Sequence, residues 1–373
     1  MKAVCVSCFD YYSTRIENVI ECLNKKQIKI KYLYASFNHF SKGKNTNKYR
    51  YGVKVKVPGY SKNLSFKRLY SHYLFAKKVE RYIKRFQPDL IYCIIPPNYL
   101  VKVLSDYKKS NPQVKLIYDV YDMWPESFPY SKYTSLLKIP FFMWSRLRSN
   151  NIDYADLIFC VSQQGKNDIV KEVNRTKVEV LKPVIVQGDM PEYHPSEDVL
   201  SFCYLGLINH ITDIDLAVNL LGRLAETKKT ILHIIGEGQK LEELVLSLRN
   251  KNVEVVCHGC VYDRKKKNDI FSLCNMGLNI PRKDIHSTMS LKAVEYLRAG
   301  LPFINSAEGD IKNIVIDDKV GIDLEIQNID GVVDKIIKYS NADYMTMHIN
   351  SIESYKTRFL NQNLDEYINS IIG

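Results

Sequence analysis

The stretch between residues 276 and 302 holds the residue types best suited to chemistry. An apolar run at 276–280 is followed by small polar residues at 287–290, and then by a helical pattern that ends at Gly300. This order predicts a strand, a polar loop and a helix with an exposed N-terminus. Because the first N–H groups of a helix are unpaired and the dipole is positive at that end, such a segment favours an anion such as phosphate.

Two charged residues lie in the expected helix. Lys292 falls in its first turn and adds positive charge close to the expected anion. Glu295 follows one turn later on the same face, where its carboxylate is suited to accept paired hydrogen bonds from hydroxyl groups, as from a ribose. An ordinary helix with a solvated lysine and glutamate is the alternative, and these residues alone leave both interpretations open.

The same residues resemble the donor helix of the family-4 glycosyltransferases of the GT-B fold, particularly the bacterial capsule and O-antigen type. That helix often reads Lys-x-x-Glu-Tyr-x-x-x-Gly-x-Pro, and the matching residues are Lys292, Glu295, Tyr296, Gly300 and Pro302. Segments 9–15, 119–127 and 235–238 are similar to further parts of the family, in family order. The resemblance therefore spans most of the chain.

The resemblance implies a fold and an activity. The fold is α/β, with two doubly wound Rossmann-like domains facing across a cleft. The activity is transfer of a sugar, of hexosyl or N-acetylhexosaminyl type, from a nucleotide diphosphate donor such as a UDP-sugar. The implied acceptor is a lipid-linked glycan precursor in surface polysaccharide synthesis. Retention of anomeric configuration, with no metal or other cofactor, is expected.

The sequence also departs from the family pattern. Ser287 stands eight residues before Glu295, where the family has a glutamate that contacts the donor sugar. No Gly-Gly pair follows the first strand, and Gly206 is not followed by a basic residue. Two alternatives stay open: a nucleotide-sugar 2-epimerase of the same fold, and a non-catalytic subunit that supports a partner glycosyltransferase.

The expected donor site follows the strands of the second half of the chain. The resemblance implies that Glu295 holds the ribose and that Lys292 and the helix N-terminus face the diphosphate. The Gly-x-Gly loop at 236–238 lets the backbone approach a ligand, and backbone groups at 259–261 would contact the base. Plain turns are the alternative for both loops. The donor-binding residues expected are Gly236, Gly238, Gly259, Val261, Ser287, Thr288, Ser290, Lys292 and Glu295.

The expected catalytic and acceptor-side residues lie mostly in the first half of the chain. Asp122 and Glu126 follow a strand and flank Trp124. A carboxylate there could take up the proton of an acceptor hydroxyl, with Asp122 as first choice and Lys292 as the third catalytic residue. Trp124, Tyr12 and Arg15 are assigned to the acceptor, Arg15 as a partner for its phosphate. The alternatives are that Trp124 fills the core, Glu126 starts a helix and Arg15 is merely exposed.

The net charge of +12 is concentrated in one region. Residues 42–85 hold 14 Lys/Arg and one acid, interleaved with tyrosine and phenylalanine. This pattern predicts docking on an anionic membrane surface, whereas nucleic-acid binding or a solvated basic face are weaker alternatives. Since no run approaches 18 apolar residues, we expect a cytoplasmic protein peripherally bound to the inner face of the plasma membrane.

The cysteines include two Cys-x-x-Cys spacings, Cys5/Cys8 and Cys257/Cys260. Such spacings invite a zinc site. Each pair begins within an apolar, strand-like run, and a regular strand sends residues three apart to opposite faces. Buried, reduced thiols are therefore expected at all four positions, with no metal.

Strand-like and helical patterns alternate along the chain, which is typical of parallel βαβ units. We expect an acceptor-side domain at 1–187, a nucleotide-sugar-binding domain at 196–353, and a helical segment at 354–373 that packs back on the first domain. The Gly- and Pro-containing stretch 186–195 is the expected linker. Strands are expected at 3–8, 30–36, 89–95, 115–121, 156–161, 178–183, 201–205, 230–235, 253–257, 277–281 and 302–305.

Overall fold

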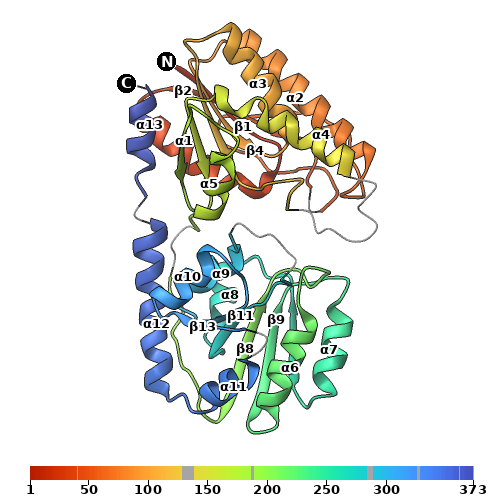
Figure 1. Ribbon diagram of the computed structural model, residues 1–373, viewed down its shortest axis with the longest axis vertical. Coiled ribbons are helices and arrows are strands. Elements are labelled where there is room, and N and C mark those ends of the chain that lie inside the picture. The colour runs from red at the N-terminus through yellow and green to blue at the C-terminus, as the bar shows by residue number, and fades with distance from the viewer. Residues whose placement is uncertain are drawn as a thin grey trace. The chain divides into compact units, whose positions relative to one another are not determined.

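A computed structural model describes residues 1–39, 41–127, 138–185, 189–283, 289–325, 328–360 and 362–372. The chain forms two compact units, one of Met1–Val184 with Gln362–Gly373 and one of Ile185–Asn361. Each unit is a parallel β-sheet flanked by helices (Figure 1). Both have the doubly wound, Rossmann-like α/β architecture.

Within the described residues, the first unit has a seven-stranded sheet in the order β3-β2-β1-β4-β5-β6-β7, paired in parallel throughout. The central strands are almost entirely buried, because helices cover both faces of the sheet. The strands are β1 (Lys2–Ser7), β2 (Lys29–Ala35), β3 (Gly52–Val55), β4 (Leu90–Ile95), β5 (Lys115–Val120), β6 (Leu157–Cys160) and β7 (Lys177–Val180).

The helices of the first unit begin where the sequence supplies a cap. Ser65 accepts the N–H of Arg68 at the start of α2, and Gln87 ends this helix in the left-handed conformation. Ser162 caps α5 in the same way. The helices are α1 (Ser13–Lys25), α2 (Phe66–Phe86), α3 (Asn98–Ser110), α4 (Lys138–Ser149) and α5 (Gln163–Val170).

The second unit has a six-stranded parallel sheet within its described residues, in the order β10-β9-β8-β11-β12-β13. Its strands are β8 (Val199–Leu205), β9 (Lys229–Ile235), β10 (Glu254–Gly259), β11 (Met276–Asn279), β12 (Phe303–Asn305) and β13 (Gly321–Asp323). Its helices are α6 (Ile214–Ala225), α7 (Leu241–Arg249), α8 (Arg264–Phe271), α9 (Leu291–Arg298), α10 (Asp310–Asp317), α11 (Ile329–Ile337) and α12 (Asn341–Tyr355).

The end of the chain returns to the first unit. α12 continues into a π-helical turn, Lys356–Leu360, and is followed by α13 (Leu364–Ile372). α13 contacts α1, and Ile368 is buried in the core beneath that helix. The helical segment expected from residue 354 is therefore divided, because a π-helical turn and the non-helical residues 362–363 separate two helices that belong to different units.

The segment expected as a linker belongs largely to the second unit, which begins at Ile185. Tyr193 is buried there, its hydroxyl donates to the carbonyl of Asn275 at 2.7 Å, and its ring stacks on His348 at 4.6 Å. Two strands were not expected, β3 and β13. Both are short edge strands, so neither carries the long apolar run that marks a central strand.

Candidate active site

Helix α9 begins at Leu291, so Lys292 does lie in its first turn. The Lys292 ammonium lies 3.9 Å from the centroid of the Tyr204 ring. A Cβ placed on Gly206 would come within 3.9 Å of the same nitrogen, so this ammonium lies beside the loop after β8. Lys292 has no carboxylate partner among the described residues. Its charge is therefore available to a ligand at the carboxyl edge of the sheet.

The N-terminus of α9 has no side-chain cap, although Ser290 occupies the cap position. The Ser290 hydroxyl donates instead to the Asn279 side chain at 2.7 Å, and Asn279 donates to Asn305 at 2.7 Å. Asn305 in turn donates to the carbonyl of Ala307. This chain of hydrogen bonds fixes the ends of β11 and β12, and leaves the first-turn amides of α9 to water or a ligand.

Tyr296 holds α9 against the sheet. Its hydroxyl accepts the N–H of Leu205 at 2.9 Å and donates to the carbonyl of Cys203 at 3.1 Å. Gly277 in β11 makes room for this ring, since a Cβ there would lie 2.7 Å from a ring carbon. The glycine and the tyrosine together set the position of Lys292 and Glu295 relative to the strand ends.

Glu295 is buried and ion-paired. One carboxylate oxygen accepts a hydrogen bond from the Lys267 ammonium, and the other accepts one from Arg298 Nε at 2.7 Å. Burial by itself raises the pKa of Glu295, but the two cations outweigh it and hold the pKa below its usual value. The carboxylate is therefore ionised and fixed, with acceptor capacity left for ligand hydroxyls.

Gly236 and Gly238 follow β9 at positive φ. A Cβ on Gly236 would lie 2.0 Å from the carbonyl oxygen of Gly206, and one on Gly238 equally close to that of Ile208. The two loops are also joined by backbone hydrogen bonds, from Gly206 to Ile235 and from Ile208 to Glu237. These glycines thus permit close packing of two loops at the carboxyl edge of the sheet. The Gly-x-Gly motif therefore has a structural role in addition to the donor contact expected for it.

The end of β10 presents exposed backbone. Gly259 is at positive φ with no atom within 4 Å of a Cβ placed on it, while Val261 packs partly on the core. Cys257 and Cys260 are exposed, so the expectation of buried thiols is wrong for this pair, because β10 is an edge strand with one side open. Cys5 and Cys8 are buried, and burial raises the pKa of each thiol to about 12.

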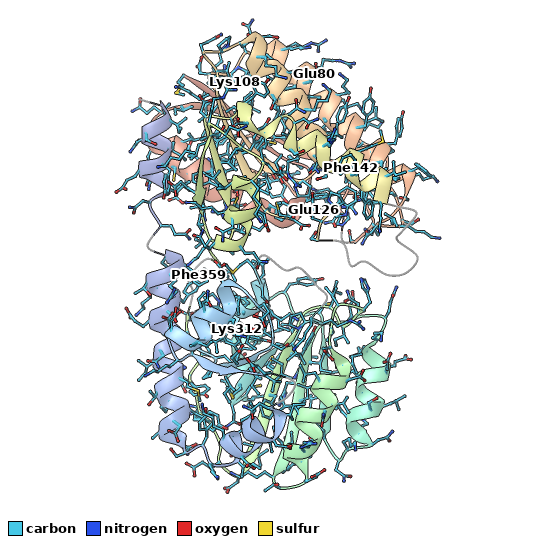
Figure 2. All side chains as sticks on the ribbon, in the orientation of Figure 1. Glu80, Lys108, Glu126, Phe142, Lys312 and Phe359 are labelled. Carbon is cyan, nitrogen blue, oxygen red and sulfur yellow. The ribbon has the colours of Figure 1, made fainter. Side chains whose placement is uncertain are left out.

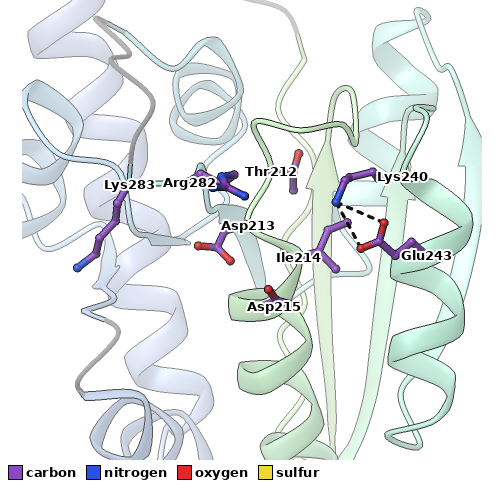
Figure 3. A pocket seen from close by; sticks show the side chains of 8 residues that line it. All are labelled: Thr212, Asp213, Ile214, Asp215, Lys240, Glu243, Arg282 and Lys283. Atoms are coloured by element: carbon purple, nitrogen blue, oxygen red, sulfur yellow. Dashed lines mark hydrogen bonds and ion pairs between the residues drawn. The ribbon is translucent and has the colours of Figure 1, made fainter. Parts of the chain in front are cut away.

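A pocket of about 440 Å³ opens at the carboxyl edge of the same sheet (Figure 3). Lys240 lies against Glu243 on one wall, and Asp213 caps α6 on the other. Three cations and three carboxylates line it, so its charges largely balance and it suits hydroxyl-rich groups. No local sequence pattern indicated this pocket, which is lined by Thr212, Asp213, Ile214, Asp215, Lys240, Glu243, Arg282 and Lys283.

Asp122 and Glu126 lie in different environments in the first unit. Burial raises the pKa of Asp122, despite a hydrogen bond from Ser127 and the charge of Arg68. Glu126 instead accepts hydrogen bonds from the buried Arg148 guanidinium at 2.8 and 3.1 Å. Arg148 also pairs with Glu172, so Glu126 belongs to an ion-pair network that ties its loop to the unit. The two carboxylates therefore differ in that Asp122 has a raised pKa, whereas Glu126 is ion-paired.

Trp124 is buried, as the alternative of a core residue would have it. Its ring packs edge-on against Phe141 and Trp144, and Arg68 lies 5.0 Å from its centroid. Asn98 donates to the Trp124 carbonyl at 3.0 Å and so fixes the loop from α3.

Arg15 is also buried, so the alternative of a merely exposed arginine is wrong. It pairs with the buried Asp119 at 3.2 Å and donates to the carbonyl of Leu181. Tyr12 is half-buried and its ring lies 4.4 Å from that of Tyr121.

Ser287 and Thr288 lie outside the described residues. Across the parts of the chain that are described, no group of three or more His, Cys, Asp or Glu side chains could hold a metal ion.

The chain is a member of the family-4 glycosyltransferases of the GT-B fold. The model "Glycosyltransferase Family 4" matches residues 13–185, and the model "Glycosyl transferases group 1" matches residues 199–341. Together they cover both units, so the activity is that of a nucleotide-sugar glycosyltransferase. No match was found among curated protein sequences.

Solved structures of low sequence identity share the fold over the full chain. Sucrose-phosphate synthase from Thermosynechococcus elongatus has a TM-score of 0.73 at 12% identity, covering 100% of this chain and 98% of its own. The lipopolysaccharide outer core galactosyltransferase WaaB has 0.66 at 16%, covering 100% and 99%. HepE of Anabaena in complex with UDP has 0.66 at 14%, covering 99% and 100%. At these identities the likeness shows the fold alone.

Proposed function

We propose that the protein transfers a hexosyl or N-acetylhexosaminyl group from a UDP-sugar to a lipid-linked saccharide in capsule or O-antigen synthesis. The observation that carries the proposal is the N-terminus of α9, which has no side-chain cap, with Lys292 beside it, which pairs with no carboxylate among the described residues. A diphosphate leaving group needs such a site, and HepE, a neighbour in fold, was solved with UDP and with UDP-glucose.

The reaction proceeds with retention and without a metal. Negative charge that develops on the leaving diphosphate is met by the first-turn amides of α9 and by the Lys292 ammonium, which are already in place before the reaction. Glu295, held by Lys267 and Arg298, accepts hydrogen bonds from the ribose. Gly259 and Val261 offer backbone groups to the base. Asp122 accepts the proton of the acceptor hydroxyl.

The lipid-linked acceptor is supported by the surface of the first unit. Basic residues of 42–85 adjoin exposed apolar side chains at the start of α2, where Phe66 is 90% exposed and Tyr70 57%. Phe142 projects from α4 in the same unit (Figure 2). Cations with exposed aromatic rings suit the interface of an anionic bilayer. No helix in the described parts of the chain is both long and apolar enough to cross a membrane.

A screen of nucleotide sugars by thermal stabilisation tests the donor, because a ligand that binds only the folded state raises its melting temperature. We expect one UDP-sugar to stabilise the protein and to be consumed only when a lipid-linked acceptor is added. Consumption with the donor alone, yielding the 2-epimer, would identify the epimerase instead. Tight binding with no turnover on any acceptor would favour a non-catalytic subunit. Activity that a chelator abolishes and magnesium restores would contradict the metal-free mechanism.

A further inference from the structure

Arg68 of α2 is a buried cation that forms no ion pair with any residue that the structure describes. Only 8% of its surface is exposed. Its Nε has no hydrogen-bond acceptor, and among the described residues it makes no ion pair with a carboxylate. The Arg68 Nη1 group donates a hydrogen bond to the carbonyl of Asn63 at 2.9 Å. A buried charge without a counter-ion is costly, so such a residue is expected where an anionic ligand completes the site.

His72 lies one turn further along α2 and is 1% exposed. Neither of its ring nitrogens has a hydrogen-bond partner in the described parts of the chain. The rings of Phe9 and Tyr60 enclose it edge-on at 5.5 and 6.0 Å. Burial, with the charge of Arg68, lowers the pKa of His72 well below its ordinary value, so the ring is neutral and keeps one N–H to donate.

The surroundings of this pair carry excess positive charge at the ligand edge of the sheet. Lys42 lies 5.2 Å from the centroid of the Tyr60 ring, and its charge acts with that of Arg68 on His39. Asp122 is the carboxylate whose charge acts on Arg68, and burial raises the pKa of Asp122. Cys8, His39 and Asp122 all follow strands of the sheet, so the cluster lies at the carboxyl ends where open α/β sheets bind ligands.

We infer that Arg68 and His72 bind the phosphate or diphosphate group of the lipid-linked acceptor. The guanidinium supplies a planar pair of donors suited to phosphate, and His72 supplies a neutral N–H. Phe66 and Tyr70, two positions before and after Arg68, are exposed and suited to lipid. The phosphate joins lipid to glycan, so its place is between lipid-facing aromatic rings and the catalytic carboxylate. This inference rests on the proposed lipid-linked acceptor.

Intrinsic fluorescence gives a local readout of this site, because the chain has only two tryptophans, Trp124 and Trp144. Their ring centroids lie 5.6 Å apart, and the Arg68 guanidinium lies 5.0 Å from the centroid of the Trp124 ring. The full chain, with UDP at saturation to fill the donor site, is titrated with geranyl diphosphate, geraniol, inorganic pyrophosphate and galacturonate. We expect saturable signals with the two diphosphates and none with geraniol or galacturonate. A saturable signal with galacturonate alone would overturn the phosphate assignment in favour of an acidic sugar.

The variants R68Q and R146Q form a matched pair. R68Q should bind geranyl diphosphate at least about tenfold more weakly, because charge-assisted hydrogen bonds are lost. R146Q removes an exposed arginine of α4 near the same tryptophans and should bind like wild type. Wild-type binding by R68Q, or equal losses in both variants, would overturn the inference.

A purely structural role for Arg68 is tested by stability. If Arg68 serves ligand binding, R68Q removes an uncompensated buried charge, and the melting temperature of the ligand-free variant should stay within about 3 °C of wild type. If Arg68 only supports the fold, the melting temperature of R68Q should fall by more than this. If R68Q does not fold, R68K is the variant to test, because it keeps the positive charge but lacks the planar pair of N–H donors of the guanidinium. Unchanged diphosphate binding by R68K would then overturn the inference. These readouts need no turnover, so the absence of transferase activity would contradict the proposed function and not this site.

Discussion

Lys267 of α8 and Glu295 of α9 form a buried ion pair whose second cation is Arg298. The carboxylate that we assign to the ribose is therefore also a structural element, because it joins two helices of the second unit. A substitution of Glu295 should therefore change two separate quantities, the affinity for the ligand and the stability of the fold.

E295Q should weaken UDP binding and lower the free energy of unfolding by about 3 kcal/mol at pH 7, because the buried Arg298 and the half-buried Lys267 lose their counter-charge. Isothermal titration and urea denaturation measure the two effects. The pKa of Glu295 is lowered on folding, so its contribution is present above the unfolded pKa of about 4.3 and is lost as pH falls through the folded value. The stability gap between wild type and E295Q should accordingly narrow in acid. A gap that is constant from pH 7 to 3 would contradict the ion pair.

K292A should lower turnover by about a hundredfold or more, because a donor that stabilises charge in the transition state is lost. The control is K265A, which removes an exposed lysine of α8 and should leave turnover within twofold, roughly the scatter expected for an exposed charge. Steady-state kinetics with saturating donor measures both variants. Unchanged turnover in K292A would remove Lys292 from the phosphate site.

Asp122 and Glu126 should separate in their effects. D122N should lower turnover with little loss of stability, whereas E126Q should lower the melting temperature by several degrees, since Arg148 is buried and loses one of two carboxylate partners. A large loss of turnover in well-folded E126Q would assign catalysis to Glu126 instead.

The pH dependence of kcat/KM offers an independent test of Asp122. Its pKa is raised by burial, and a base must be ionised, so activity should fall on the acid side through a pKa above 3.8. Changing the donor sugar should not move this limb. A profile that is flat down to the pH of unfolding would exclude Asp122 as the base.

G238A should destabilise the second unit by at least about 2 kcal/mol. The new Cβ would clash with the carbonyl oxygen of Ile208, and the backbone at this position has a positive φ. Thermal unfolding measures the change. G259A at the end of β10 also has positive φ but meets no atom, so it should cost less. Equal losses would show that conformation, and not close loop packing, explains the glycine at 238.

F66A should weaken binding to vesicles that contain anionic phospholipid by about tenfold, the effect of losing one buried aromatic side chain. Vesicle sedimentation measures it, and raised salt should weaken wild-type binding, because the basic residues of 42–85 contribute through charge. L246A, which removes an exposed leucine of α7 in the second unit, is the control. Vesicle binding that neither F66A nor salt affects would place the membrane contact elsewhere.

The order of the motifs and the alternation of strand and helix were enough to predict the GT-B fold. α2 runs over Phe66–Phe86, where a serine cap, an amphipathic repeat and a left-handed end are all local signals. Lys292 likewise falls in the first turn of α9 as expected. β3 and β13 escaped prediction because edge strands lack a continuous apolar run.

Local sequence determined which segments are strands and helices, and which side chains stand at strand ends, because periodicity and caps act within a few residues. Only the tertiary structure decided the partners of the charged side chains. Arg15 pairs with Asp119, Glu126 with Arg148 and Glu295 with Lys267, and the partners in each pair are distant in the sequence. The tertiary structure also places Arg68 at the ligand edge of the sheet with no ion-pair partner in the described ranges. Spacing along a chain cannot encode these outcomes, because burial and pairing depend on which distant element comes to lie beside each charge.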